Sequence, residues 1–327
     1  MADVVTFGEA MIRLSPPQFR RLEQTTTLDL AVGGAELNVA VGVARRGLSA
    51  AWVSCLPGNP LGRMTQNKAR EQGVDTQWLA WDRAGRMGLY FVEYGSSPRP
   101  SAVTYDRAMS AMSRLDGVSF DWHAILSGAR VLHTTGITAA LSHAAADQVR
   151  QAMTAAHDLG ILVTYDLNYR ARLWSEAEAR SVQEPLMSLV DVLITTEEDT
   201  KRVFGIEGAD YEDVGRALAD RFGFKIVTIT LRGDTSVLRN QWTAIAYADG
   251  AILRDRTYEI EIVDRVGGGD AYAAGFIYGL LLEDVQAGVR WGNALSALKQ
   301  TTWSDFSWST KPEIEALMSG ASLRIAR

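Results

Sequence analysis

The sequence predicts an α/β fold in which helices cover both faces of a mostly parallel sheet. Segments rich in β-formers alternate with segments of helical periodicity through most of its 327 residues. Repeated strand-then-helix units of this length favour parallel pairing, because each helix carries the chain back across the sheet. Two further segments depart from this alternation and predict a small β excursion above the sheet.

Strands and helices are expected in a regular order along the chain. The strand-like segments are residues 3–11, 49–58, 129–136, 161–168, 191–198 and 224–233. The segments of helical periodicity are residues 35–47, 142–160, 175–190 and 211–223. Parallel sheets of this kind bind ligands beyond the carboxyl ends of their strands, so the residues that follow each strand are candidates for function.

The two departing segments, residues 13–33 and 85–108, are rich in β-formers, prolines and turn residues but lack a helical partner. They could be two long surface loops. The apolar residues Leu89, Phe91 and Val103 argue against loops and favour a small sheet that stands over the main one as a lid. No internal repeat or low-complexity linker interrupts the chain, so residues 1–327 are expected to form a single domain with this lid.

The composition excludes several classes of protein. A hydrophobic content of 47% and a charged content of 22% are ordinary for a soluble globular protein. A formal net charge of −6 offers no basic surface for nucleic acid or acidic membranes. No apolar run approaches the roughly 20 residues that span a bilayer, and the N-terminus lacks the pattern of a signal peptide. We therefore expect a cytoplasmic protein with no nucleic-acid or membrane partner.

The cysteine and histidine content argues against a disulfide framework and a protein-held metal. Cys55 is the single cysteine, which fits a reducing compartment. We expect it to be a small core residue, with a nucleophilic role as the alternative. The four histidines show no paired ligand spacing, so no metal site built from protein ligands is expected.

Three consecutive glycines, residues 267–269, precede Asp270 where a strand meets a helix. The alternation at residues 258–262 predicts a strand with one buried face, and the apolar residues 271–282 are typical of a buried helix. The first amides of such a helix have no intrahelical partner, and the helix dipole adds positive potential there. Glycines leave those amides accessible to a ligand.

Two interpretations of this turn remain open from the residues alone. Asp270 could simply cap the helix after a tight turn. Alternatively, the glycine amides could bind a phosphoryl group while Asp270 accepts the proton of an attacking hydroxyl. The turn matches neither the phosphate-loop motif nor the dinucleotide fingerprint.

Two longer segments carry a resemblance to the ribokinase-like carbohydrate kinases. DRVGGGDAYAAG, residues 264–275, resembles their C-terminal signature, whose usual form is D-T-x-G-A-G-D, and GGAELNVAVGVARRG, residues 33–47, resembles their N-terminal signature. The resemblance covers essentially the whole chain. It implies a Rossmann-like core with a β lid and a magnesium-dependent transfer of the γ-phosphoryl group of ATP to a sugar hydroxyl. Lid surfaces in this family often pair between subunits, which implies a homo-oligomer.

Within that family, several segments are most similar to the 2-keto-3-deoxygluconate kinases. They are GGAELN, with Glu36 where fructokinases tend to have proline, and VTYDRAMSAMS, GITAALS, DLNYRARLW, TLRGDTS and ALKQTTWSDFSW. The acceptor of such a kinase would be the 6-hydroxyl. A fructokinase or other neutral-sugar kinase of the same fold remains an alternative, as does a catalytically weakened relative that senses a sugar acid or nucleotide.

The resemblance implies a role for each matched residue. Asp270 would be the general base, and the amides of Gly267, Gly268 and Gly269 would form the anion hole. Arg107 and Arg170 would bind the carboxylate of an acidic sugar, because a guanidinium can donate two parallel hydrogen bonds to it; surface ion pairs are the alternative. The other expected substrate contacts are Gly34, Asn38, Tyr90, Tyr105, Asn168 and Asp305, and the expected nucleotide contacts are Thr230, Arg232, Gly233 and Asn293. The alternatives are a helix cap or buttress for Asn38, packing for the two tyrosines, and an exposed helix face for Asn293.

Three departures from the family pattern raise questions. Thr196 and Asp199 stand where the family usually has an asparagine and a glutamate that help to organise magnesium and phosphate. Trp303 and Ser304 replace the usual Pro-Gly before Asp305, which puts the shape of that loop in doubt. Arg13 stands where many sugar kinases carry an aspartate that holds sugar hydroxyls, and it could face an acidic substrate or be structural.

Overall fold

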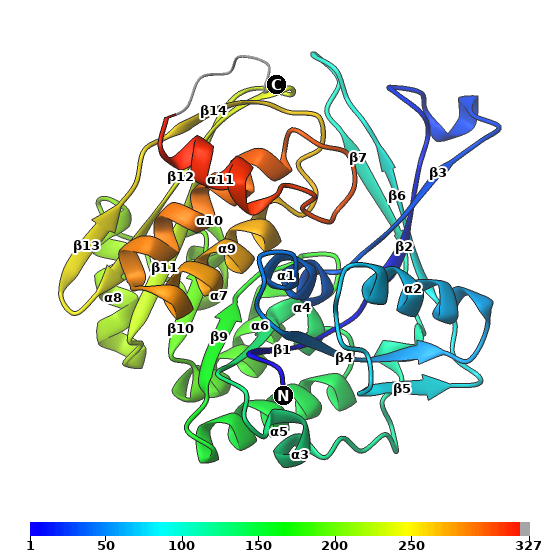
Figure 1. Ribbon diagram of the computed structural model, residues 1–327, viewed down its shortest axis with the longest axis horizontal. Coiled ribbons are helices and arrows are strands. Elements are labelled where there is room, and N and C mark those ends of the chain that lie inside the picture. The colour runs from blue at the N-terminus through cyan, green and yellow to red at the C-terminus, as the bar shows by residue number, and fades with distance from the viewer. Residues whose placement is uncertain (321–327) are drawn as a thin grey trace.

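The computed structural model describes residues 1–320, apart from the side chains of Asp234 and Thr235. Its centre is a ten-stranded sheet in the order β13-β12-β11-β10-β9-β8-β1-β4-β5, with β14 paired to β12. Helices cover both faces of this sheet, and a second sheet stands at one side of the molecule (Figure 1). The predicted fold class is therefore confirmed.

Seven strands of the main sheet run parallel, and their carboxyl ends meet at one edge. They are β1 (Val4–Phe7), β4 (Ala50–Pro57), β5 (Leu79–Asp82), β8 (Val131–Thr135), β9 (Leu162–Asp166), β10 (Val192–Thr195) and β11 (Ile226–Ser236). Three further strands extend the sheet beyond β11 through antiparallel pairing, namely β12 (Arg239–Ala248), which pairs with β11, and β13 (Ala251–Arg254) and β14 (Tyr258–Glu261), which both pair with β12.

Alternate residues of the central strands face opposite helical layers, as Val4 and Val5 of β1 do. One layer contains α1 (Ala35–Ala44), α2 (Pro60–Glu71), α9 (Gly268–Leu282), α10 (Val285–Lys299) and α11 (Lys311–Met318). The other contains α3 (Trp122–Leu126), α4 (Gly136–Ala139), α5 (His143–Asp158), α6 (Glu176–Gln183), α7 (Glu197–Phe204) and α8 (Tyr211–Phe222). The 3-10 turns are η1 (Leu22–Gln24), η2 (Ala111–Ser113) and η3 (Glu184–Leu189).

Helix α9 is the helix predicted after the three glycines, and it is buried almost all round. It packs between α1 and α10, and a β-carbon added to Gly275 would lie 2.5 Å from the Trp291 carbonyl oxygen. This close approach of two helix backbones is possible because glycine has no side chain. On the α1 side, a β-carbon added to Gly42 would lie 2.3 Å from the Ala274 β-carbon, so α9 is held closely between the two helices.

The second sheet, which we call the lid sheet, has the order β3-β2-β6-β7. Its strands are β2 (Met11–Ser15), β3 (Asp29–Gly33), β6 (Gly88–Glu93) and β7 (Ala102–Asp106). The pairs β2–β3 and β6–β7 are antiparallel, whereas β2–β6 is parallel. The two departing segments therefore do pair in space, and the loop alternative is wrong.

Two expected strands differ from the structure at their ends. The segment at residues 3–11 is not one strand, because the chain leaves the main sheet after β1 and enters the lid sheet at Met11. Gly8 lies at this crossing, where an added β-carbon would be 2.0 Å from the Glu36 carboxylate. The strand expected at residues 191–198 ends at Thr195, because Thr196 caps α7 through a hydrogen bond from the Asp199 amide to its hydroxyl oxygen.

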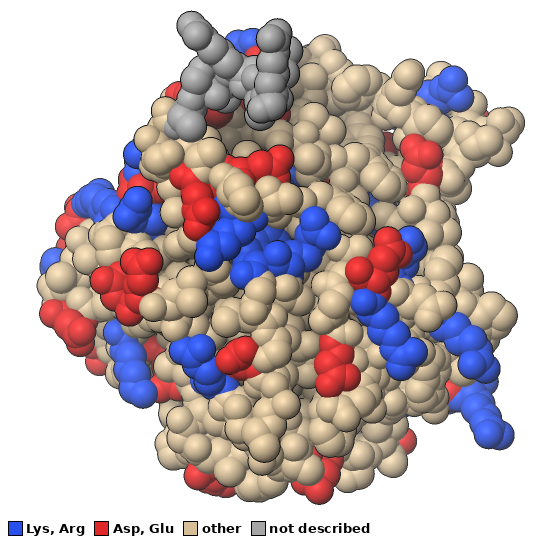
Figure 2. Space-filling model, in the orientation of Figure 1, with Lys and Arg blue, Asp and Glu red and all other residues tan. Residues whose placement is uncertain are grey.

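The surface carries charges of both signs. On the face drawn in Figure 2, acidic and basic side chains are interspersed, with a small basic group near the middle. No helix within residues 1–320 is long and apolar enough to cross a membrane.

Candidate active site

A cleft of about 1020 Å³ lies between the lid sheet and the carboxyl ends of the parallel strands. Residues at or just beyond three strand ends line it, namely Glu9, Asp166 and Thr195, and so does Thr230, which follows the part of β11 that pairs with β10. The lid sheet contributes Tyr90 and Tyr105. The cleft is therefore where a parallel α/β sheet is expected to bind its ligand.

Asp270 lies in the first turn of α9, with its side chain partly exposed to this cleft. The Asn38 side-chain amide on α1 donates a hydrogen bond to Asp270 Oδ2 over 2.6 Å. Burial raises the pKa of Asp270 to about 6, and the charge of Asp305 adds to the shift, whereas the Asn38 hydrogen bond opposes it. A carboxylate with such a pKa is suited to accept a proton near neutral pH.

The glycine turn, residues 267–269, presents two of its three members to the cleft. Gly267 is the N-cap of α9 with a left-handed φ of 82°, and an added β-carbon would lie 2.3 Å from the Asp305 carbonyl oxygen. A β-carbon on Gly269 would meet no atom within 4 Å. Both line the cleft, whereas the Gly268 amide donates to the Arg265 carbonyl oxygen over 3.2 Å and closes the turn behind them.

Two further carboxylates face the same cleft. Burial raises the pKa of Asp166 well above its ordinary value, and the charges of Asp270 and Asp199 raise it further. Burial also raises the pKa of Asp199, while the charge of Arg170 opposes this shift. Asp166 was missed in the sequence, although it stands at the carboxyl end of an apolar strand, where a ligand contact is expected.

A third buried carboxylate, that of Glu36, also lines the cleft. Its Oε1 accepts hydrogen bonds from the hydroxyls of Thr135 and Thr138 over 2.8 and 2.7 Å. Burial raises the pKa of Glu36 to about 7, against the effect of these two hydrogen bonds.

Arg107 and Arg170 both line the cleft, but their present partners differ. Arg170 is exposed on the loop after β9, and its Nη1 donates to the Tyr169 carbonyl oxygen over 3.0 Å. Arg107, just after β7, forms a largely buried ion pair with Glu9, which also accepts a hydrogen bond from Ser110. Glu9 was missed in the sequence because 98 positions separate it from Arg107.

Tyr90 and Asp305 line the cleft and bind each other. The Tyr90 hydroxyl donates to Asp305 Oδ2 over 2.5 Å, and its ring stacks on Tyr105 at 5.9 Å. The other Asp305 oxygen accepts from Arg13 over 2.8 Å. Arg13 is fully buried and is not among the residues that line the cleft, so it does not face a substrate there.

The remaining expected substrate contacts, Gly34, Asn38 and Asn168, also line the cleft. A β-carbon on Gly34 would lie 2.1 Å from the Glu9 carbonyl oxygen. Asn168 adopts a left-handed φ of 41°, and its Nδ2 lies 3.3 Å from Asp166 Oδ2.

The expected nucleotide contacts divide into two groups. Thr230 and Arg232 line the cleft, whereas Gly233 lies farther along β11 and is not among its lining residues. Asn293 is fully buried in α10, outside the cleft lining, with its Nδ2 3.5 Å from Asp255 Oδ2. Its Oδ1 is buried and has no hydrogen-bond partner among the described residues.

Neither a protein metal cage nor a reactive thiol stands out in the described part of the chain. Within residues 1–320, no group of three or more His, Cys, Asp or Glu side chains is arranged to hold a metal ion. Cys55 is buried in the core, and burial raises its pKa to about 11.

Comparison with known proteins gives one family. The model of the pfkB family carbohydrate kinases matches residues 1–305. The 2-dehydro-3-deoxygalactonokinase of Haloferax volcanii is 38% identical to this chain over 329 residues, which cover 100% of this chain and 99% of that protein. The 2-dehydro-3-deoxygluconokinase of Thermotoga maritima has a solved structure with a TM-score of 0.94 and 44% identity, covering 97% of this chain and 98% of its own.

A more distant structure extends the likeness of fold. It is a protein of E. coli assigned as a ribokinase II and solved with ATP and Mg²⁺, with a TM-score of 0.85 at 21% identity over 98% of this chain and 100% of its own. The family match spans most of the chain, and the two closer relatives cover nearly all of it. The chain belongs to the pfkB family of carbohydrate kinases.

Proposed function

We propose that the protein transfers the γ-phosphoryl group of ATP to the 6-hydroxyl of 2-keto-3-deoxygluconate (2-dehydro-3-deoxygluconate) or a close keto-deoxy sugar acid. The observation that carries this proposal is the position of Asp270. Its carboxylate opens onto the cleft from the first turn of a buried helix, next to accessible glycines, and within a cleft that also contains two arginines.

Asp270 is the general base of the proposed reaction. The acceptor hydroxyl gives its proton to the Asp270 carboxylate while its oxygen forms a bond to the γ-phosphorus, and the bond from that phosphorus to the leaving ADP oxygen breaks. A positioned base typically contributes about 10² to 10⁴ in rate. The Asn38 hydrogen bond keeps the carboxylate oriented toward this task.

The glycine turn stabilises the negative charge of the transferring group. Amides at the start of α9 lack intrahelical partners and lie at the positive end of the helix dipole. Gly267 and Gly269 line the cleft next to Asp270, so their amides are available to phosphoryl oxygens. Gly268 takes part by closing the turn that holds the other two.

An acidic substrate is favoured by Arg107 and Arg170 on the cleft lining. Arg107 exchanges or shares its ion pair with Glu9 when the sugar carboxylate arrives, and Arg170 supplies a second guanidinium, which is exposed. The names of the relatives in Haloferax volcanii and Thermotoga maritima, both kinases of dehydro-deoxy sugar acids, support this substrate class. A neutral-sugar kinase would not need these cations.

The residues fit ATP and magnesium. Thr230 and Arg232 line the cleft as contacts for the nucleotide. The orphaned Oδ1 of Asn293 is an acceptor suited to a nucleotide amino group, but it is buried outside the cleft lining, so this contact requires the site to open at α10. Asp166 and Asp199 would hold Mg²⁺, directly or through water, because both carboxylates line the cleft and carboxylate oxygens are ligands that this ion prefers. A bound Mg²⁺ would neutralise charge on the phosphates during transfer.

A homo-oligomer in the cytoplasm is also proposed. Exposed apolar side chains on and beside the lid sheet, including Phe19, Leu30 and Met109, support association through this surface. Light scattering across a range of protein concentrations measures the assembly, and a monomer at all of them would contradict it.

Phosphorylation kinetics with a panel of acceptors tests the substrate class. The panel contains 2-keto-3-deoxygluconate, 2-keto-3-deoxygalactonate and fructose, each with ATP and Mg²⁺. We expect kcat/KM for at least one keto acid to exceed that for fructose by about 10² or more, since the charge pairs are lost with a neutral sugar. Equal values would favour a neutral-sugar kinase, and binding of the keto acids without ATP consumption would favour a sensor.

A further inference from the structure

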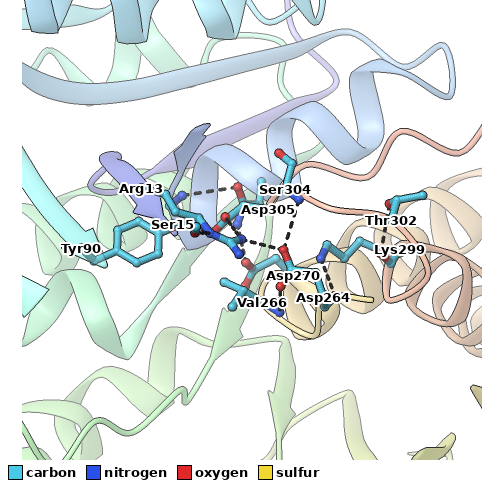
Figure 3. A network of polar contacts seen from close by, with 12 residues as sticks. Arg13, Ser15, Tyr90, Asp264, Val266, Asp270, Lys299, Thr302, Ser304 and Asp305 are labelled. Atoms are coloured by element: carbon cyan, nitrogen blue, oxygen red, sulfur yellow. Dashed lines mark hydrogen bonds and ion pairs between the residues drawn. The ribbon is translucent and has the colours of Figure 1, made fainter. Parts of the chain in front are cut away.

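A cluster of buried charges joins the lid sheet to the glycine turn (Figure 3). The Arg13 side chain on β2 is 0% exposed, and its Nη1 lies 2.7 Å from Asp264 Oδ2 and 2.8 Å from Asp305 Oδ1. Lys299 at the end of α10 donates from Nζ to the Asp264 carbonyl oxygen over 2.8 Å. Two cations and two carboxylates thus balance each other away from water.

Two departures from the family pattern meet in this cluster. The Trp303 ring covers the Arg13 guanidinium, with 5.5 Å between the guanidinium carbon and the ring centroid. Ser304 has a φ of 93°, in the region that favours glycine, and its amide donates to Asp264 Oδ2 over 3.1 Å. Ser304 therefore adopts the backbone of the glycine that it replaces, with Asp264 as the acceptor that supports it.

Both carboxylates held by Arg13 also contact the candidate active site. Asp264 Oδ1 accepts a hydrogen bond over 3.0 Å from the amide of Val266, the residue before Gly267. The Asp305 backbone packs on Gly267 so closely that an added β-carbon would lie 2.3 Å from the Asp305 carbonyl oxygen. The Asp305 side chain accepts from the Tyr90 hydroxyl on the lid sheet over 2.5 Å.

We propose that Arg13 is a positioning residue for phosphoryl transfer: it fixes Asp264 and Asp305, and through them the glycine turn and Tyr90, with Trp303 as its cover. The inference rests on the role proposed above for the glycine turn. It assigns a purpose to Arg13 and Trp303, which replace the usual residues at two places that are far apart in the sequence.

The expected effect follows from the burial of these charges. If Arg13 is removed, two neighbouring carboxylates remain with one cation, and an uncompensated buried charge is strongly unfavourable. The carboxylates of Asp264 and Asp305 then move apart, or they take up water or a proton. Either change displaces the glycine turn, because Asp305 packs on it directly and Asp264 binds the Val266 amide just before it. Small displacements of catalytic groups can cost about 10²-fold in rate.

Two substitutions at Arg13 test the proposal. Arg13→Met keeps the length of the side chain without its charge, and we expect kcat to fall about tenfold or more while KM for ATP and the keto acid changes less than about threefold. Arg13→Lys keeps the charge without the planar fork, so we expect an intermediate kcat. Thermal unfolding of each variant reports whether it is folded.

Arg46→Met is a matched control for the loss of a buried arginine. Arg46 is 5% exposed and donates to the Gly42 and Ser309 carbonyl oxygens and to the Ser307 hydroxyl. None of these acceptors belongs to Asp264 or Asp305, so the loss of Arg46 should lower the melting temperature and leave kcat within about twofold. An equal fall of kcat in both variants would make Arg13 merely structural and overturn the proposal.

Trp303→Leu tests the contact of the Trp303 ring with the Arg13 guanidinium. We expect it to lower kcat in the parent protein and to add little to Arg13→Met, because residues that act through one contact are not additive. If Arg13→Met does not fold, Arg13→Lys and Trp303→Leu test the proposal in its place, and a kcat like that of the parent protein in both variants overturns it.

Asp270→Asn separates this inference from the proposed function. An active Asp270→Asn variant would refute the proposed function, whereas an inactive Asp270→Asn variant beside a fully active Arg13→Met variant would refute this inference alone.

Discussion

The side-chain amide of Asn38 lies 2.6 Å from Asp270 Oδ2, although 232 positions separate the two residues. Asn38 belongs to α1 and Asp270 to the first turn of α9, so this hydrogen bond joins the two signature segments of the chain. The close packing of α9 against α1 fixes both backbones. The proposed base is therefore oriented by a helix from the opposite end of the sequence.

Replacing Asp270 with asparagine should lower kcat by about 10² to 10⁴ with little change in either KM, because the proton acceptor is lost while the shape of the site is kept. Burial disfavours the ionised carboxylate, so the melting temperature above pH 7 should be unchanged or higher. Steady-state kinetics and thermal unfolding measure both. Turnover within a few-fold of the parent would exclude Asp270 as the base.

The pH dependence of kcat/KM should report the ionisation of Asp270. Its pKa is raised from an ordinary value of 3.8 to about 6, so the base is protonated and inactive below that pH. We expect kcat/KM to fall about tenfold per pH unit below this point. Asn38→Leu removes the hydrogen bond that lowers this pKa, so the acid limb should move to higher pH. An unmoved limb would assign the ionisation to another group.

Two alanine substitutions in the glycine turn should fail in different ways. Gly267→Ala places a methyl group against the Asp305 carbonyl oxygen at a left-handed φ, so we expect a large fall in melting temperature together with lost activity. Gly269→Ala adds a methyl group in open space on the cleft, so the protein should keep its melting temperature and lose kcat by about tenfold or more. If Gly269→Ala remained fully active, the amides beside it would not bind the transferring phosphoryl group.

Much of the fold could be predicted because the alternation of strands and helices is a local signal. The start of α7 could not be predicted, because Thr196 follows the β-forming residues of β10 and continues their strand-like pattern. In the structure, the Asp199 amide donates a hydrogen bond to the Thr196 hydroxyl oxygen, which caps the helix. The Glu9–Arg107 ion pair joins a strand end of the core to the lid, and no spacing in the sequence relates these two positions. Each of two such residues can be proposed from the sequence as a site residue. That they pair with each other is seen only in the structure, because the topology of the sheet brings them together.

The ion pair of Arg107 with Glu9 leads to a prediction about acceptor choice. Arg107→Met should lower kcat/KM for the keto acid by about tenfold to a hundredfold, mostly through KM, because a charge-assisted contact to the sugar carboxylate is lost. Fructose, which has no carboxylate, should lose much less. Arg86→Met is the matched control, because Arg86 also lies by the lid sheet but pairs with Asp106 at 40% exposure and is absent from the cleft lining. Competition assays with both acceptors measure the ratio directly. If Arg107→Met weakened the keto acid and fructose equally, Arg107 would shape the lid and would not recognise the carboxylate.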